Sequence, residues 1–158
     1  MVFSPIFECE DYNKASIRVA IGMRGVLADF RNDYPENDVR FGIGIHSGRL
    51  VAGNIETDAP SEFTVIGDTV DLAARLESLT KEYGTDLLFS GDVAAGISPK
   101  SGIFSNDLDE VQVRGRQKGL QIFTSENNFK KPDRTKTIKF KDFSSEFLTF
   151  YQKLVTKL

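Results

Sequence analysis

The segment from Val39 to Ile55 constrains the fold more than any other part of the chain. Apolar residues alternate there with small or polar ones, in the order Phe41, Gly42, Ile43, Gly44, Ile45, His46. A period of two is the pattern of a β-strand, so one face is apolar and the other is almost bare of side chains. Glycine weakens a strand, and two glycines on one face indicate that something approaches the backbone closely. A packed helix and a bound ligand explain this approach equally well.

A β-hairpin is the expected continuation of this strand. Ser47, Gly48 and Arg49 have turn composition, and residues 50–55 are expected to return as the second arm. Residues 54–62 should then form a loop, followed by a short apolar run that leads to Gly67.

The segment after that loop reads TVIGDTVDLAARLE over residues 64–77, which predicts a strand end, a turn and a helix start. Asp68 or Thr69 can cap this helix, which should run to about Tyr83 and stop at Gly84. The N–H groups at a helix start favour anions. Asp71 and Arg75 are four residues apart and therefore share one helix face. From these residues alone, a capped helix with a weak surface ion pair is the simpler interpretation.

The rest of the chain mixes helical and extended patterns. Residues 1–6 resemble a strand end, and a helix is expected over 13–30 with Asn13 as its N-cap. Its apolar face would comprise Ala20, Met23, Leu27 and Phe30. Further elements are expected as strands at 86–90, 104–114 and 120–125, a short helix at 91–97 and an amphipathic helix at 143–158. This order predicts an α+β layer architecture rather than a doubly wound sheet.

Length and cysteine content narrow the class of protein. The 158 residues fit one domain. No apolar run approaches the ~20 residues that span a bilayer, and the N-terminus lacks a signal-peptide pattern, so no membrane segment is expected in this chain. The single cysteine, Cys9, excludes an intrachain disulfide and a multi-cysteine metal site. A cytoplasmic protein is therefore expected, which leaves open a membrane anchor elsewhere in the parent.

The net charge of −3 is unevenly distributed. From Asn127 onward eight basic residues stand against three acidic ones, so this tail carries +5 and the preceding body −8. A solvated linker is the simpler explanation, and a partner-binding tail is the alternative. No nucleic-acid partner is expected, because the basic residues belong to no recognisable binding module. The expected division is a domain over 1–126 and a basic linker with a C-terminal helix over 127–158.

Two motifs carry a resemblance to a known family. The run GDTVDLAARLE over residues 67–77 resembles the signature of class III adenylate and guanylate cyclases, of which GDTVNLAARLE is a common bacterial form. The run FGIGIHSGRLVAGN over residues 41–54 resembles the hairpin that precedes it in the family. The similarity extends from about Met1 to Ser125. It implies a ferredoxin-like cyclase homology domain.

The resemblance implies a reaction and several site residues. Cyclases of this class convert ATP to cyclic AMP and pyrophosphate by attack of the ribose 3′-hydroxyl on the α-phosphate, at a site shared between two subunits. Arg75 matches the arginine that stabilises transition-state charge, and its guanidinium can place parallel donors on phosphate oxygens. Asp71 stands where the family usually has the ribose-orienting asparagine. Thr64 matches the adenine-reading position, which favours ATP over GTP.

The remaining implied contacts are with the phosphates. Arg114 resembles the lysine that holds the terminal phosphates, and Arg116 is a fallback because a two-residue slip in that turn is easy. Gly53 and Asn54 are candidates for approach to the nucleotide, although a turn requirement explains them equally well. The family also uses two Mg²⁺ or Mn²⁺ ions held by two aspartates.

Neither of those metal aspartates can be assigned here. The nearest early acid, Asp11, matches neither family motif, so the sequence is interpreted as lacking the first strand and the helices that follow it. The chain alone is therefore expected to be inactive. The expected partner is a second copy in a homodimer, or a second cyclase domain that supplies the metal aspartates. The open sheet edge should favour a dimer or larger oligomer.

Two other functions remain open. One is a non-catalytic cyclase-homology module that binds nucleotide or dimerises, and the other is an interaction domain with a vestigial site. For His46 a packing or turn role is favoured over catalysis. Asp68 and Thr69 are interpreted as helix caps, and Cys9 as an inert thiol.

Overall fold

A computed structural model describes residues 1–4, 8–37, 39–55, 62–113 and 119–125. These residues fall into two compact units, the described parts of Met1–Phe41 and of Gly42–Pro132. The expected amphipathic helix at 143–158 and the basic tail lie outside the described residues. No described helix is long and apolar enough to cross a membrane.

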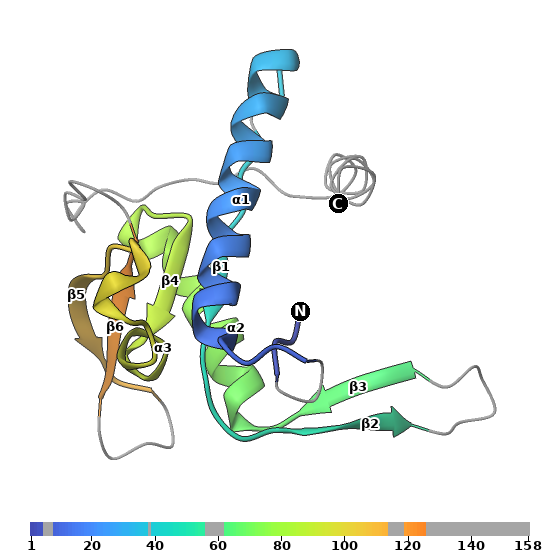
Figure 1. The fold of residues 1–158 in the computed structure, drawn as a ribbon. Coiled ribbons are helices and arrows are strands. Elements are labelled where there is room, and N and C mark those ends of the chain that lie inside the picture. The colour runs from blue at the N-terminus through green and yellow to red at the C-terminus, as the bar shows by residue number, and fades with distance from the viewer. Residues whose placement is uncertain (5–7, 38, 56–61, 114–118, 126–158) are drawn as a thin grey trace. The chain divides into compact units, whose positions relative to one another are not determined.

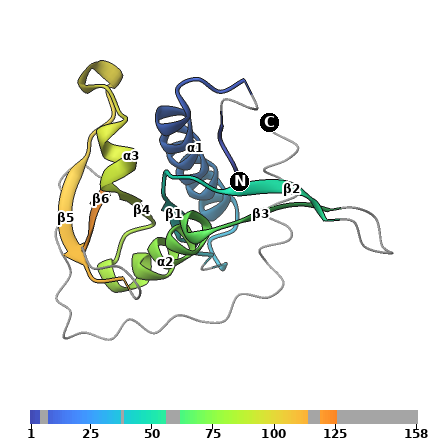
Figure 2. The same cartoon turned by 90° about the horizontal axis from the view of Figure 1, so that it is seen from below.

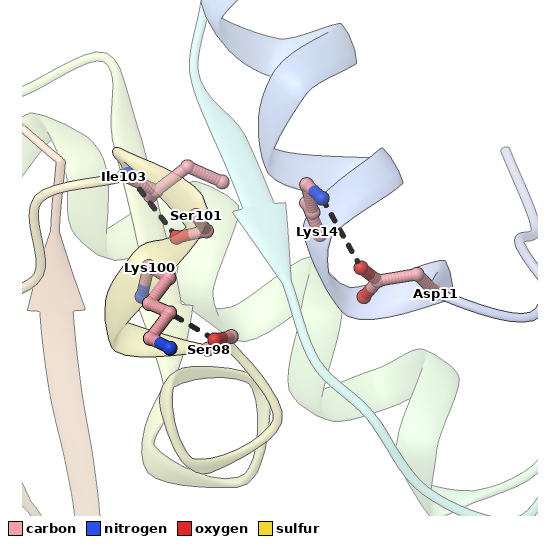
Figure 3. Close-up of polar contacts among 6 residues, drawn as sticks. All are labelled: Asp11, Lys14, Ser98, Lys100, Ser101 and Ile103. Atoms are coloured by element: carbon pink, nitrogen blue, oxygen red, sulfur yellow. Dashed lines mark hydrogen bonds and ion pairs between the residues drawn. The ribbon is translucent and has the colours of Figure 1, made fainter.

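The first unit consists mainly of helix α1, Tyr12–Asp33. The predicted helix is confirmed, and three of its four expected core residues are buried, whereas Met23 is half-buried. The predicted N-cap is wrong: Asp11 precedes the helix, makes no side-chain cap hydrogen bond and instead pairs with Lys14 at 3.5 Å (Figure 3). Asn13 lies inside the first turn, where its carbonyl accepts a hydrogen bond from the Ser16 hydroxyl. The described residues 1–4 form no strand, contrary to the expectation for 1–6.

The second unit contains a four-stranded sheet with the strand order β1-β4-β6-β5 (Figure 1). Strand β1 pairs in parallel with β4, whereas β6 pairs antiparallel with both β4 and β5. The strands of this sheet are β1 (Ile43–Ile45), β4 (Leu87–Ser90), β5 (Asn106–Val111) and β6 (Leu120–Thr124). Mixed pairing with helices on an open sheet confirms the predicted α+β class.

Helix α2, Asp68–Tyr83, packs on this sheet and ends where the sequence predicts. Leu72, Leu76, Leu79 and Tyr83 recur every three or four residues and are at most 6% exposed. They form one core with Leu88 of β4 and with Leu120 and Ile122 of β6. Gly84 adopts φ 63° and closes the helix, because glycine reaches this left-handed conformation at no steric cost.

The bare face of β1 is explained by α2. A Cβ on Gly44 would lie 2.9 Å from the Leu76 carbonyl carbon, and closer still to the Ala73 carbonyl oxygen and the Glu77 nitrogen. A Cβ on Gly42 would likewise meet Glu77 and Thr80. Of the two explanations that the sequence allows, close packing of a helix is therefore the correct one at both glycines.

The predicted hairpin between residues 41–45 and 50–55 is wrong. Strand β2 (Val51–Ile55) does form, but its partner is β3 (Glu62–Ile66), in an antiparallel ribbon. Figures 1 and 2 show this ribbon extending away from the four-stranded sheet. Strand β1 instead pairs with β4, which lies more than forty residues further along the chain. A loop was expected over residues 54–62, but residues 54 and 55 belong to β2 and residue 62 belongs to β3. Residues 56–61 lie outside the described residues.

A short helix and a turn follow β4. Helix α3, Gly91–Ala95, confirms the expected element, and the 3-10 turn η2 spans Pro99–Ser101. Within this turn the Lys100 backbone N–H donates to the Ser98 hydroxyl at 3.3 Å, and Ile103 N–H donates to the Ser101 hydroxyl at 3.2 Å (Figure 3). These local bonds direct the chain into β5, the strand at the sheet edge opposite β1.

Candidate active site

The junction between β3 and α2 is a single residue, Gly67. Its φ of 144° lies in a region that side chains rarely adopt, so glycine is needed for the strand to turn directly into the helix. The predicted caps are wrong, because Gly67 occupies the cap position and Asp68 is the first helical residue. The Thr69 hydroxyl instead donates to the Arg49 carbonyl at 2.6 Å. This bond joins the start of α2 to the segment that leaves β1.

Asp71 and Arg75 lie on the side of α2 that faces away from the core. Both residues are exposed, whereas Leu72 and Leu76 beside them are buried. Their spacing places them one turn apart on the same face, as predicted. Among the described residues no ion pair joins their side chains. The weak surface ion pair of the simpler interpretation is therefore absent, and the Arg75 guanidinium is not held by Asp71.

The ribbon brings together two more of the candidate residues. Gly53 and Thr64 are cross-strand partners, and the backbone of Asn54 pairs with that of Phe63. A Cβ added to Gly53 would have no neighbouring atom within 4 Å, so the space above this glycine is open. Val51 and Ile66 form the cross-strand pair two positions away from Gly53 and Thr64, so both pairs lie on the same face of the ribbon. They expose 73% and 60% of their surface, so this face is apolar and uncovered by the chain's own described residues.

The other candidates are not placed by the structure. Arg114 and Arg116 lie outside the described residues. The described residues contain no group of three or more His, Cys, Asp or Glu side chains that could hold a metal ion. Mg²⁺ or Mn²⁺ therefore has no matching ligand set in the described part of the chain.

A buried contact between His46 and Ser90 was not predicted as part of the site. The side chain of His46, which follows β1, is 2% exposed, and its Nδ1 lies 2.8 Å from the hydroxyl of Ser90. Ser90 is fully buried at the end of β4. The two residues are 44 positions apart, so no local spacing in the sequence could have indicated the contact.

Comparison with known proteins shows the family of the chain. The model of the adenylate and guanylate cyclase catalytic domain matches residues 1–126. An adenylate cyclase of Anabaena cylindrica is 35% identical over 86 residues, which cover 54% of this chain and 17% of that protein. Adenylate cyclase 1 of Rhizobium meliloti is 38% identical over 89 residues, which cover 56% of this chain and 13% of that protein. The chain thus spans less than a fifth of either relative.

Solved structures share the fold. The crystal structure of the adenylyl cyclase CyaB from P. aeruginosa aligns with a TM-score of 0.60 at 24% identity, covering 75% of this chain and 61% of that one. A bacterial light-regulated adenylyl cyclase aligns with the same TM-score at 23% identity, covering 91% of this chain and 38% of that one. These likenesses show the fold, and the match of the family model over residues 1–126 decides the family. The chain belongs to the adenylate and guanylate cyclase catalytic domain family.

Proposed function

We propose that this chain is part of an adenylate cyclase that converts ATP to cyclic AMP and pyrophosphate at a dimer interface. The observation that carries the proposal is the position of Arg75, exposed on the signature helix and joined by no ion pair to Asp71. The adenylate cyclases among the relatives support ATP as the substrate. The proposed catalytic domain covers the family match, with residues 127–158 as a basic linker.

In this proposal Arg75 binds the α-phosphate as charge develops there. The reaction breaks one phosphorus–oxygen bond and forms another within a single molecule, so it needs positioning and charge stabilisation above all. A guanidinium donates in parallel to two phosphate oxygens, which a lysine ammonium does not reproduce. The core on the opposite face of α2 holds the helix rigid, so Arg75 is presented from a fixed backbone.

Thr64 and Gly53 form the proposed base-binding side of the site. The Thr64 hydroxyl can donate to or accept from the edge of a purine. Gly53 opposite it adds no side chain, and its open space leaves room for a flat ring. Arg114, with Arg116 as the alternative, is proposed to bind the terminal phosphates, and the Asn54 backbone to lie beside the nucleotide.

The proposed partner that completes the active site is a second, different cyclase domain, because another copy of this chain would lack the same metal aspartates. Mg²⁺ or Mn²⁺ would bind to aspartates that this partner supplies, and the chain alone would be inactive. The lack of an assignable metal motif in the sequence supports this arrangement. The exposed Val51–Ile66 pair on the ribbon supports contact with another protein surface, since apolar pairs of this kind tend to be covered. We also propose a cytoplasmic location, which the proposed ATP substrate and the single cysteine support.

A second candidate function is a regulatory module that binds nucleotide without cyclising it. Asp71 favours it, because its carboxylate stands one turn from Arg75 and would repel a triphosphate. The two functions differ in catalysis and not in fold.

The test is an assay of cyclic nucleotide formation with Mn²⁺ and either ATP or GTP. The chain is assayed alone and mixed with a cyclase domain that carries intact metal aspartates. The adenylate cyclase proposal expects cyclic AMP from the mixture only. Saturable ATP binding without product in the mixture would favour the regulatory module, and cyclic GMP as the main product would overturn the substrate assignment.

A further inference from the structure

We infer that His46 is a positioning residue, which holds the start of α2 in place through Ser90, Gly48 and Thr69. The inference concerns the helix that carries Asp71 and Arg75, and its functional consequence rests on the proposed cyclase activity. The contacts that His46 makes are independent of that proposed activity.

The first link is the bond between His46 and Ser90. Ser90 precedes helix α3, a position where a serine hydroxyl usually caps the helix, yet its side chain makes no cap hydrogen bond. Its hydroxyl lies instead 2.8 Å from His46 Nδ1. The carboxylate of Asp92 is also near, but at 3.7 Å it lies beyond hydrogen-bond distance and its side chain is 60% exposed. The buried serine is therefore the hydrogen-bond partner of Nδ1, and this bond ties the ends of the parallel strands β1 and β4.

The second link runs from the His46 ring to α2. The position that a Cβ on Gly48 would take lies 3.6 Å from His46 Nε2 and 2.7 Å from the Thr69 hydroxyl oxygen. A side chain on Gly48 would therefore clash with the Thr69 hydroxyl and touch the imidazole ring, so Gly48 lies beside both residues. The Thr69 hydroxyl also donates to the Arg49 carbonyl, the next residue along the chain. The segment after His46 therefore begins at a buried side chain and is tied to the first turn of α2 by the Thr69–Arg49 bond.

The consequence is a defined location for the first turn of α2. Gly67 allows the strand to enter the helix directly but, having no side chain, makes no side-chain cap hydrogen bond. The Val70 and Asp71 N–H groups bond to the Gly67 carbonyl, so this turn depends on where Gly67 and Thr69 are held. If the His46–Ser90 bond is lost, the first turn should open more often, while the last turns of α2 stay anchored by the core.

The test is amide hydrogen exchange in the full 158-residue chain with three variants. His46→Phe keeps a ring in the buried site but removes the bond to Ser90, and Ser90→Ala removes the same bond from the other side. His46→Asn retains an N–H near the Nδ1 position. We expect exchange at residues 70–73 to become about five- to tenfold faster in the first two variants, with residues 80–83 unchanged and His46→Asn close to wild type.

The double variant H46F/S90A should exchange no faster than His46→Phe alone, because the histidine substitution already removes the bond to Ser90. Unchanged exchange at residues 70–73, or an equal increase along all of α2, would overturn the inference. If His46→Phe does not fold, Ser90→Ala alone decides, because Ser90 contacts the same ring nitrogen.

An activity measurement extends the test to the site. In a mixture that forms cyclic AMP, we expect His46→Phe to lower kcat about tenfold or more with little change in KM for ATP, and His46→Asn to restore it. A change in KM alone would contradict positioning of Arg75. If no mixture forms cyclic AMP, the proposed function fails, and the exchange measurements still decide whether His46 positions the helix.

Discussion

Asp71 and Arg75 lie one turn apart on the exposed face of α2, and no ion pair joins them among the described residues. The arginine is therefore available for a phosphate, but a carboxylate stands beside it. These two side chains have opposite effects on an incoming triphosphate, and the balance between them sets the activity that the site can reach.

Replacement of Asp71 by asparagine should raise activity. At about 4 Å two unit charges repel by ~1 kcal/mol in water, so removing the carboxylate should increase kcat/KM for ATP about fivefold. The measurement is cyclic AMP formation in a mixture with a partner bearing intact metal aspartates. Glu82→Gln is the matched control, because it removes the same charge from an exposed position on α2 about 16 Å further along the axis. Equal activity of Asp71→Asn and wild type would refute the inhibitory role.

Replacement of Gly44 by alanine should destabilise the fold. The new methyl group would overlap the backbone of α2 at Ala73, Leu76 and Glu77, and such overpacking costs about 1–3 kcal/mol or more. Urea unfolding should show a lower midpoint with an unchanged slope. Gly22→Ala in α1 is the control, because nothing lies within 4 Å and the exposed helix should gain about 0.5–1 kcal/mol. A Gly44→Ala midpoint equal to that of wild type would mean that β1 and α2 are not packed this closely.

A larger side chain at Gly53 should block nucleotide without harming the fold. The space above Gly53 is open, so valine fits there and suits a strand, but it would occupy the room beside Thr64. We expect ATP affinity to fall about tenfold or more while the unfolding midpoint is unchanged. Ala52→Val is the control, since it adds bulk to the opposite face of the ribbon. Equal ATP affinity in both variants would remove Gly53 from the site.

A charge on the exposed ribbon face should weaken self-association. Ile66→Lys places an ammonium on the Val51–Ile66 pair, and its 60% exposure means that the fold loses little. Light scattering should show dimers of the wild-type chain and mainly monomers of Ile66→Lys at the same concentration. Phe104→Lys, at a residue with the same exposed fraction, should leave the dimer intact. A wild-type chain that is monomeric over a wide concentration range would contradict the proposed interface.

Local sequence patterns predicted the helix of the site well. The apolar spacing from Leu72 to Tyr83 and the glycine at 84 are signals within one element, and the end of α2 follows from them. The start does not, because the cap is Gly67 and neither Asp68 nor Thr69. The shared face of Asp71 and Arg75 follows from helix geometry alone. The α+β class could be predicted for the same reason, because the spacing of apolar residues along each segment distinguishes a helix from a strand.

Strand pairing could not be predicted in this way. Residues 47–49 have turn composition, so a hairpin was the local expectation, but β1 pairs with β4 and β2 pairs with β3. The alternating glycines reflect α2, which begins more than twenty residues later, and the contact of His46 with Ser90 spans 44 positions. These relationships depend on tertiary packing, for which a single sequence contains no periodic signal.

The most direct test of the central claim is complementation of a cyclase domain that keeps its metal aspartates but has lost its own transition-state arginine. This chain should restore cyclic AMP formation from ATP when mixed with that domain. Arg75→Ala and Arg75→Lys should reduce kcat about 10²–10³-fold, with ATP affinity largely kept and the fold intact, because Arg75 is exposed. Restoration of equal activity by the wild-type chain and by Arg75→Ala would contradict the assignment of Arg75 as the residue that stabilises the transition state.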